Sequence, residues 1–127
     1  MSDHDSVYKI LIIDDERTLQ SMLRSVLTSH GFEVIASGTG EEGLIMARTE
    51  EPDLVLLDVI LPGMKGREVC QRLKADPVTK DIPVVFLTAK DSDDDVAAEI
   101  AVGAVEHITK PVNSMALIRK LKKILGA

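Results

Sequence analysis

Short apolar runs alternate along the chain with segments in which apolar residues recur at helical spacing. The short runs predict five strands, at residues 8–13, 33–36, 54–57, 83–87 and 106–109. Because strand and helix patterns alternate and the strands are apolar almost throughout, the sheet is expected to be parallel and covered by helices on both faces. The predicted fold class is therefore α/β, a doubly wound five-stranded parallel sheet.

The apolar stripes of the intervening segments predict which side of each helix faces the sheet. Gly31 is expected to end the first helix. The second helix has the weakest pattern, because Gly43 lies in its first turns and lowers helix propensity. In chain order, the expected stripes are Leu19, Met22, Leu23, Val26 and Leu27; Leu44, Ile45 and Ala47; Val69, Cys70 and Leu73; Val96, Ala97, Ile100 and Ala101; and Leu117, Ile118, Leu121, Ile124 and Leu125.

Length and charge exclude several classes of protein. The 127 residues fit one compact domain, residues 1–127, of which 1–6 are expected to fray. A net charge of −6 opposes binding to nucleic acid or anionic lipid. No apolar run is long enough to cross a bilayer and residues 1–7 do not resemble a signal peptide, so we expect a cytoplasmic protein. Cys70 is the single cysteine, which excludes an internal disulfide and favours core packing over a reactive thiol.

Polar residues stand where the predicted strands end. Asp14 and Asp15 follow the first strand, Asp58 the third, Thr88 the fourth and Lys110 the fifth. Open parallel sheets bind ligands outside the carboxyl ends of their strands, where the strand order reverses. With the order 2-1-3-4-5 this point lies between strands one and three, so the three aspartates are expected to converge there.

Three carboxylates in one crevice require a compensating cation. Each pair repels by about 4 kcal/mol at about 4 Å and an effective dielectric constant of about 20. Mg²⁺, or Mn²⁺ in its place, suits such a site because it prefers oxygen ligands and commonly joins carboxylates to a phosphoryl group. Lys110 would add a second positive charge, and Thr88 a hydroxyl donor.

Each of these residues also has an ordinary structural interpretation. Asp14 or Asp15 could cap the first helix, since aspartate is a favoured N-cap. Thr88 could be an unremarkable strand end and Lys110 a solvated charge. Taken singly, these readings are the better ones, but their joint placement at the strand ends favours a functional site.

Four ordered motifs and two supporting segments resemble the response-regulator receiver family of two-component signalling. The resemblance spans nearly the whole chain, and it implies the flavodoxin-like strand order 2-1-3-4-5. Each motif alone is weak, whereas the ordered set is specific. The motifs are Asp14-Asp15 after KILII, Asp58 after DLVLL, Thr88-Ala89 after PVVFL and Lys110-Pro111 after HIT, with LPGMKG and GEEGL as supporting segments.

The resemblance implies a role for each strand-end residue. Asp58 would be the phosphoacceptor, taking a phosphoryl group from a sensor histidine kinase, a histidine phosphotransfer protein or a small phosphodonor. Asp15, Asp58 and the backbone carbonyl of Ile60 would ligate Mg²⁺, with Asp14 acting mainly through bound water. Lys110 would pair with the phosphoryl oxygens.

The resemblance also implies how the signal is passed on. Thr88 would move toward the phosphoryl group and the ring at position 107 would turn inward, which alters the face built from helix four, strand five and helix five. A downstream protein target or output domain would bind this face, in a monomer or a phosphorylation-dependent dimer. Neither nucleic acid nor a membrane would be a direct partner, and no enzymatic activity is expected beyond self-phosphorylation and autodephosphorylation. The bond between Lys110 and Pro111 would be cis.

The chain departs from the family at a few positions. His107 stands where Tyr or Phe is usual, so pH could bias the switch, although an imidazole that merely fills the same space is the simpler reading. Ile60 and Lys90 lie where the family tunes access of water to the phosphoryl group. Val112 replaces a common phenylalanine.

Three other functions are compatible with parts of the sequence. Residues 38–43 match GxGxxG and would suit a nucleotide-binding flavodoxin-like protein, but Glu41 and Glu42 place negative charge where a pyrophosphate would bind. An aspartyl-phosphate hydrolase uses the same nucleophile and metal, but needs a cap or substrate pocket for which the chain is short. A module that keeps the fold without phosphorylation conflicts with the complete set of acidic, hydroxyl and lysine residues.

Overall fold

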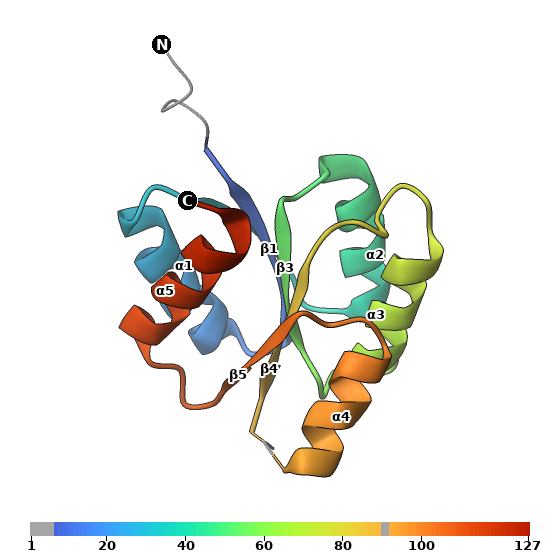
Figure 1. Ribbon diagram of the computed structural model, residues 1–127. Coiled ribbons are helices and arrows are strands. Elements are labelled where there is room, and N and C mark those ends of the chain that lie inside the picture. Colours follow the sequence, from blue (N-terminus) through green and yellow to red (C-terminus); the bar gives the residue numbers. More distant parts are fainter. Residues whose placement is uncertain (1–6, 90–91) are drawn as a thin grey trace.

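The computed structural model describes residues 7–89 and 92–127, and it consists of a central sheet between two layers of helices (Figure 1). The fraying expected for residues 1–6 and the role expected for Lys90 lie outside the described residues. No helix in the described part of the chain has the length and apolarity that crossing a bilayer requires. The elements are β1 (Lys9–Ile13), α1 (Arg17–Ser29), β2 (Glu33–Ser37), α2 (Gly40–Glu50), β3 (Leu54–Asp58), α3 (Gly66–Ala75), β4 (Val84–Thr88), α4 (Asp93–Ala101), β5 (Glu106–Thr109) and α5 (Ser114–Leu125).

The five strands are parallel and lie in the order β2-β1-β3-β4-β5, which confirms the predicted fold class. Strand ends differ from the predicted ranges by one residue at most. Asp58 and Thr88 are the last residues of β3 and β4, so both are held by the sheet itself. The order places β1 beside β3, and the reversal of strand order therefore falls between them.

Each face of the sheet has its own apolar core. Helices α1 and α5 cover one face, while α2, α3 and α4 lie on the other (Figure 1). Alternate residues of the strands point to opposite faces, so both sides of the central strands must be apolar. The first core includes Ile10, Ile12, Leu23, Leu27, Leu54, Leu56, Val85, Leu87, Leu117 and Leu121, and the second includes Leu11, Ile13, Ala47, Val55, Leu57, Val69, Cys70, Leu73, Val84 and Phe86.

Two glycines explain local features of the helices. Gly31 has φ of +88° just after α1, as expected for a residue that stops a helix in the left-handed region. Gly43 lies so close to β1 that an added Cβ would sit 2.5 Å from Cδ1 of Ile13. A side chain at this position would collide with β1, which explains why a residue of low helix propensity stands here. The Thr39 hydroxyl caps the helix by accepting a hydrogen bond from Glu42 N–H at 3.2 Å.

The predicted stripes are confirmed for α1, α3 and α5 and are wrong in part for α2 and α4. On α2, Ile45 is exposed and the glycine side packs on the sheet instead. On α4, Ala97, Ile100 and Ala101 are exposed, and Glu99 is buried with 2% of its surface accessible. The inward side of α4 is therefore built around an acidic residue that the apolar pattern did not include.

Cys70 has the structural role expected of it. Its side chain is buried in the second core, and its Sγ donates to Val102 O at 3.2 Å. Burial raises the pKa of the thiol to about 11, although Lys74 opposes this shift. The thiol is therefore protonated near neutral pH, which makes a reactive cysteine unfavourable.

Leu56→Ala is expected to lower the free energy of unfolding by about 2–5 kcal/mol, because Leu56 is inaccessible in the centre of β3 and the truncation leaves a cavity. Ile45→Ala is the matched control, since Ile45 is 63% exposed, and should change stability by less than about 0.5 kcal/mol. Urea denaturation measures both. Equal losses in the two variants would contradict the described packing.

Candidate functional site

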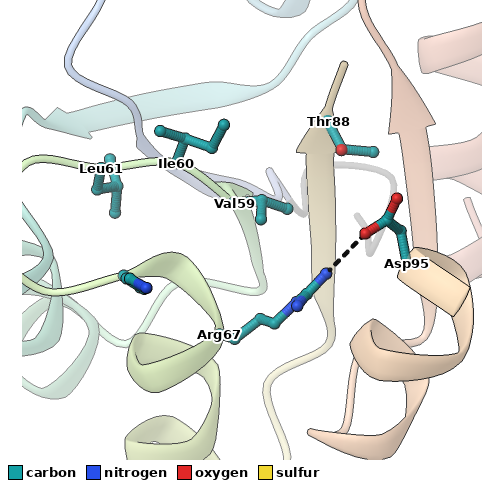
Figure 2. Close-up of a pocket in the computed structure, with 7 residues that line it drawn as sticks. Val59, Ile60, Leu61, Arg67, Thr88 and Asp95 are labelled. Carbon is teal, nitrogen blue, oxygen red and sulfur yellow. Dashed lines mark hydrogen bonds and ion pairs between the residues drawn. The ribbon is translucent and has the colours of Figure 1, made fainter. Parts of the chain in front are cut away.

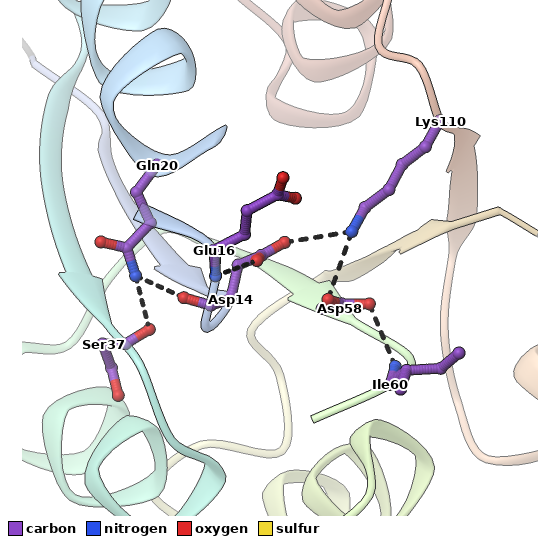
Figure 3. A network of polar contacts seen from close by, with 7 residues as sticks. All are labelled: Asp14, Glu16, Gln20, Ser37, Asp58, Ile60 and Lys110. Carbon is purple, nitrogen blue, oxygen red and sulfur yellow. Dashed lines mark hydrogen bonds and ion pairs between the residues drawn. The ribbon is translucent and has the colours of Figure 1, made fainter. Parts of the chain in front are cut away.

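Three carboxylates meet at the carboxyl ends of β1 and β3, and Figure 3 shows two of them, Asp14 and Asp58. Asp14 and Asp15 directly follow β1, and Asp58 ends β3. One oxygen from each of the three lies within 4.8 Å of the others. Asp14 is inaccessible, Asp58 is 7% exposed and Asp15 is exposed. The predicted convergence of the three aspartates is confirmed, and Asp15 is the member of the cluster that faces solvent.

Hydrogen bonds fix both the backbone and the side chain of Asp14. Its backbone N–H donates to Ser37 O at 3.0 Å, and its Oδ1 accepts from Glu16 N–H at 2.8 Å. The Gln20 side-chain amide donates to Asp14 O and, at 3.1 Å, to Ser37 O. The N-cap of α1 is Glu16, without a side-chain cap bond, so neither aspartate has the N-cap position that the structural alternative requires.

The loop after β3 holds the Asp58 carboxylate in place. Its Oδ1 accepts from the backbone N–H of Ile60 at 3.0 Å. Gly66 N–H donates to Val59 O at 3.0 Å, which closes the loop onto the start of α3. A Cβ on Gly66 would sit 2.1 Å from Asp58 O, so only glycine allows this approach of α3 to β3.

Lys110 connects the two buried aspartates. Its Nζ lies 3.3 Å from Asp14 Oδ2 and 3.2 Å from Asp58 Oδ2. Burial alone lowers the pKa of Lys110, but the attraction of the two carboxylates outweighs it and the pKa is raised overall. Burial raises the pKa of Asp14, repulsion from Asp58 adds to this, and the Glu16 N–H and Lys110 oppose it. Two carboxylates therefore share one ammonium, which offsets one of the three negative charges.

A cleft of about 460 Å³ opens above Asp58. The Ile60 side chain is 67% exposed at its edge, whereas Thr88 is buried at 3%. Asp58 thus lines an opening that also contains a hydroxyl and an ammonium. The lining residues are Asp15, Asp58, Val59, Ile60, Leu61, Pro62, Thr88, Ala89 and Lys110.

A second hollow of about 290 Å³ adjoins this cleft and shares Val59, Ile60, Leu61 and Thr88 with it (Figure 2). Across it, Arg67 on α3 approaches Asp95 on α4, with 3.3 Å between Nη2 and Oδ1. Asp95 also accepts from the Ser92 hydroxyl at 2.6 Å, within the cap of α4. The first turn of α4 is therefore linked to α3 beside the acidic cleft.

The structure brings together every predicted site residue except one. Asp14, Asp15, Asp58 and Lys110 surround one point, with Ile60 and Thr88 beside it. His107 lies elsewhere, on β5, where it lines a separate cavity of about 120 Å³ under α4. The expected cis bond between Lys110 and Pro111 is present.

Several supporting residues were not identified from the sequence. Gln20 and Ser37 hold Asp14, and nothing in their local pattern indicates this, because the contact joins α1 to β2. Gly66 is the second glycine of the LPGMKG segment, and a glycine at this position could have indicated that the backbones of α3 and β3 approach each other closely. Arg67 and Asp95 meet only through the packing of α3 against α4.

Comparison with known proteins identifies the family. The model of the response regulator receiver domain matches residues 10–122. The chain belongs to the response-regulator receiver family. Protein PilH of Pseudomonas aeruginosa is 36% identical to this receiver domain over 118 residues, covering 93% of this chain and 98% of PilH. The regulatory protein PhoP of Bacillus subtilis is 39% identical over 117 residues, covering 92% of this chain and 48% of PhoP, so the receiver domain spans about half of that relative.

Solved structures agree with the described fold. Chemotaxis protein CheY4 of Vibrio cholerae superposes with a TM-score of 0.90 at 29% identity, covering 94% of this chain and 100% of that structure. A sensor histidine kinase receiver domain from Pseudomonas aeruginosa, whose structure has a magnesium ion in the active-site cleft, superposes with a TM-score of 0.88 at 24% identity. The superposition covers 96% of this chain and 100% of that domain. At this identity the second structure supports the fold alone.

Gly66→Ala is expected to destabilise the receiver domain by about 1–3 kcal/mol, because the new Cβ overlaps Asp58 O and forces β3 and α3 apart. Gly38→Ala is the control, since a Cβ there meets nothing within 4 Å, and it should cost less than about 0.5 kcal/mol. Chemical denaturation gives both values. A Gly66 variant as stable as the Gly38 variant would show that the approach of α3 to β3 can relax.

Proposed function

We propose that this receiver domain, residues 1–127, accepts a phosphoryl group on Asp58 with the help of a divalent metal ion. The observation that carries the proposal is the cluster of Asp14, Asp15 and Asp58 within 4.8 Å, with Lys110 Nζ 3.2 Å from Asp58. Asp58 lines the open cleft, whereas Asp14 is inaccessible. Of these two, Asp58 is the carboxylate that a phosphodonor can reach.

The donor set fits Mg²⁺, or Mn²⁺ in its place. Both are hard cations that take oxygen ligands and retain several waters. Asp15 and Asp58 would ligate the ion together with the backbone carbonyl of Ile60, and Asp14 would act through water. When bound, the ion supplies positive charge beside the phosphoryl oxygens.

The residues of the chain position the reacting atoms and balance their charge. A carboxylate oxygen of Asp58 attacks phosphorus while the bond from phosphorus to the donor atom breaks, and the donor keeps that electron pair. Lys110 then has an anionic phosphoryl oxygen to pair with in place of the free carboxylate. The Ile60 N–H keeps the Asp58 carboxylate oriented, and Thr88 has a hydroxyl at the rim of the same cleft.

The expected donor is a sensor histidine kinase or a histidine phosphotransfer protein, and a small acyl phosphate would serve in their absence. No further substrate is expected to be turned over, because the acceptor is part of the chain. Loss of the phosphoryl group to water, by autodephosphorylation, would return the domain to its starting state.

The signal is proposed to leave through the face formed by α4, β5 and α5. Thr88 lies at the end of β4, so a movement toward the phosphoryl group would change the surroundings of α4 and β5. His107 on β5 is the proposed second switch residue. The receiving partner would be a protein target or an output domain. The net charge of −6 favours a protein over direct contact with nucleic acid for this segment.

The nucleotide-binding alternative gains no support from the fold. Residues 38–43 do join β2 to α2, but Glu41 and Glu42 lie in the first turn of α2, where a pyrophosphate would bind. Strand β2 is at the edge of the sheet, away from the reversal of strand order. An aspartyl-phosphate hydrolase would also need a pocket that encloses its substrate. The described cleft is open to solvent on the side of Asp15, which does not favour this alternative.

Mg²⁺ is expected to raise the melting temperature of the wild-type protein, because it relieves repulsion among the three carboxylates. An ion at about 100 times its Kd adds about 2.7 kcal/mol to stability. Asp58→Asn should show a smaller shift, since one ligand and one negative charge are lost. Differential scanning calorimetry with and without Mg²⁺ measures this, and identical shifts in both proteins would place the ion elsewhere.

Acetyl phosphate with Mg²⁺ is expected to add one phosphoryl group to the wild-type protein and none to Asp58→Asn. Intact-mass spectrometry at mildly acidic pH reads the result directly. Asp81→Asn is the matched control, because Asp81 is exposed and outside the cleft, and it should label as the wild type does. Equal labelling of wild type and Asp58→Asn would show that the acceptor is another residue.

A further inference from the structure

Glu99 is a buried acid that the proposed phosphoryl chemistry does not use. It lies on the inward side of α4 and is 2% exposed. Neither Oε1 nor Oε2 accepts a hydrogen bond from any residue that the structure describes. The side chain borders the cavity of about 120 Å³ between α4 and β5, and His107 borders the same cavity. A strong acceptor without a donor among the described residues thus shares a cavity with an imidazole.

Burial makes the ionised form of Glu99 costly in this arrangement. Burial raises the pKa of Glu99, with a smaller contribution from Asp95, whereas His107 and Arg67 lower it. The folded state therefore binds a proton more tightly than the unfolded chain does. It follows that the stability contributed by protonated Glu99 is complete below its ordinary pKa and is lost as pH rises through the raised pKa.

His107 faces the same cavity from the edge strand. It pairs in register with Phe86 of β4, so its side chain is on the α3 and α4 side of the sheet. Its Nδ1 lies 3.7 Å from Glu106 Oε1, and its carbonyl oxygen accepts from Lys120 Nζ of α5 at 3.1 Å. Lys120 also lies 3.7 Å from Glu106 Oε1, so Glu106 already has a cationic neighbour.

We propose that Glu99 and His107 form a proton-linked latch between α4 and β5. The two side chains hold one proton between them. When the ring of His107 turns over the cavity, the proton leaves the Glu99 carboxyl oxygen and bonds to an imidazole nitrogen, which produces a carboxylate–imidazolium contact without a proton from elsewhere. The latch would join two of the three elements in the proposed signalling face, and its regulatory meaning rests on that proposed function.

Arg67 is a less suitable partner for Glu99. Its guanidinium comes from α3, and Nη2 is 3.3 Å from Asp95 while Nε has no hydrogen-bond partner among the described residues, so its ion pair links α3 to α4 and not α4 to β5. A guanidinium also remains charged at all working pH values, whereas an imidazole titrates near neutrality. A contact with Arg67 would therefore persist at high pH, while a contact with His107 would be lost.

The latch has a defined pH range. The contact is attractive while the pair holds one proton. As pH rises through the raised pKa of Glu99 the pair loses its proton, and a buried carboxylate is left beside a neutral ring. The attachment of α4 to β5 should therefore weaken at alkaline pH, and α4 should open more often.

Hydrogen–deuterium exchange of the full chain tests this. Protection of α4 amides is compared at about pH 6 and about pH 8.5, corrected for intrinsic exchange, with α1 as internal reference. In the wild type, α4 protection should fall about tenfold relative to α1. In Glu99→Gln, which mimics the protonated acid, the ratio should not change with pH. In His107→Gln, where only Glu99 can lose a proton and no contact with the ring is broken, the change should be smaller than in the wild type. The same pH response in the wild type and either variant would overturn the latch.

Two further variants separate the neighbouring charges. Glu106→Gln should keep the pH response, because Glu106 already lies beside Lys120. Loss of the response in Arg67→Gln together with its retention in His107→Gln would overturn the proposal in favour of Arg67. Acetyl phosphate labelling of wild type and Glu99→Gln is measured in parallel. Absent labelling of the wild type contradicts the phosphoacceptor function, whereas normal labelling with a pH-independent α4 contradicts the latch alone.

Discussion

The ion pair network of Lys110 with Asp14 and Asp58 is the interaction on which the site depends. A carboxylate as inaccessible as that of Asp14 is costly to bury without a compensating charge. Lys110 lies 3.3 Å from it and 3.2 Å from Asp58, and thereby allows two acidic strand ends to be neighbours. The third carboxylate, Asp15, remains exposed, which leaves net negative charge at the opening where a divalent cation and a phosphodonor would meet.

Sheet order makes this network possible. Because β1 and β3 are adjacent, the residues that follow them share one edge, and the long side chain of Lys110 spans the distance from β5. The backbone around the site is equally constrained, since Gly66 approaches Asp58 O too closely for any side chain and Gln20 joins α1 to β2 under Asp14. The site is thus held mainly by strand ends, and Lys110 and the exposed Asp15 complete it.

The second polar cluster is of a different kind. Between α4 and β5 the chain buries Glu99 without a hydrogen-bond donor among the described residues, next to a histidine on an edge strand. The surroundings of Glu99 determine whether its carboxyl group is protonated, and its protonation state in turn changes how well α4 packs there. In a receiver domain whose signal is proposed to pass through α4 and β5, this arrangement would let proton binding act on the same elements as phosphorylation.

The sequence alone determined the strands, the class of sheet and the acidic, hydroxyl and lysine residues at the strand ends, because burial on both faces and polar strand ends leave a strong local pattern. It misplaced the inward sides of α2 and α4, where Gly43 and Glu99 face the sheet, since periodicity counts apolar residues and cannot register close backbone approach or a buried acid. Only the tertiary structure decided that Asp14 is buried against Lys110 and that Glu99 shares a cavity with His107. These contacts join residues far apart in the chain, and their energies depend on distance and burial that local sequence does not encode.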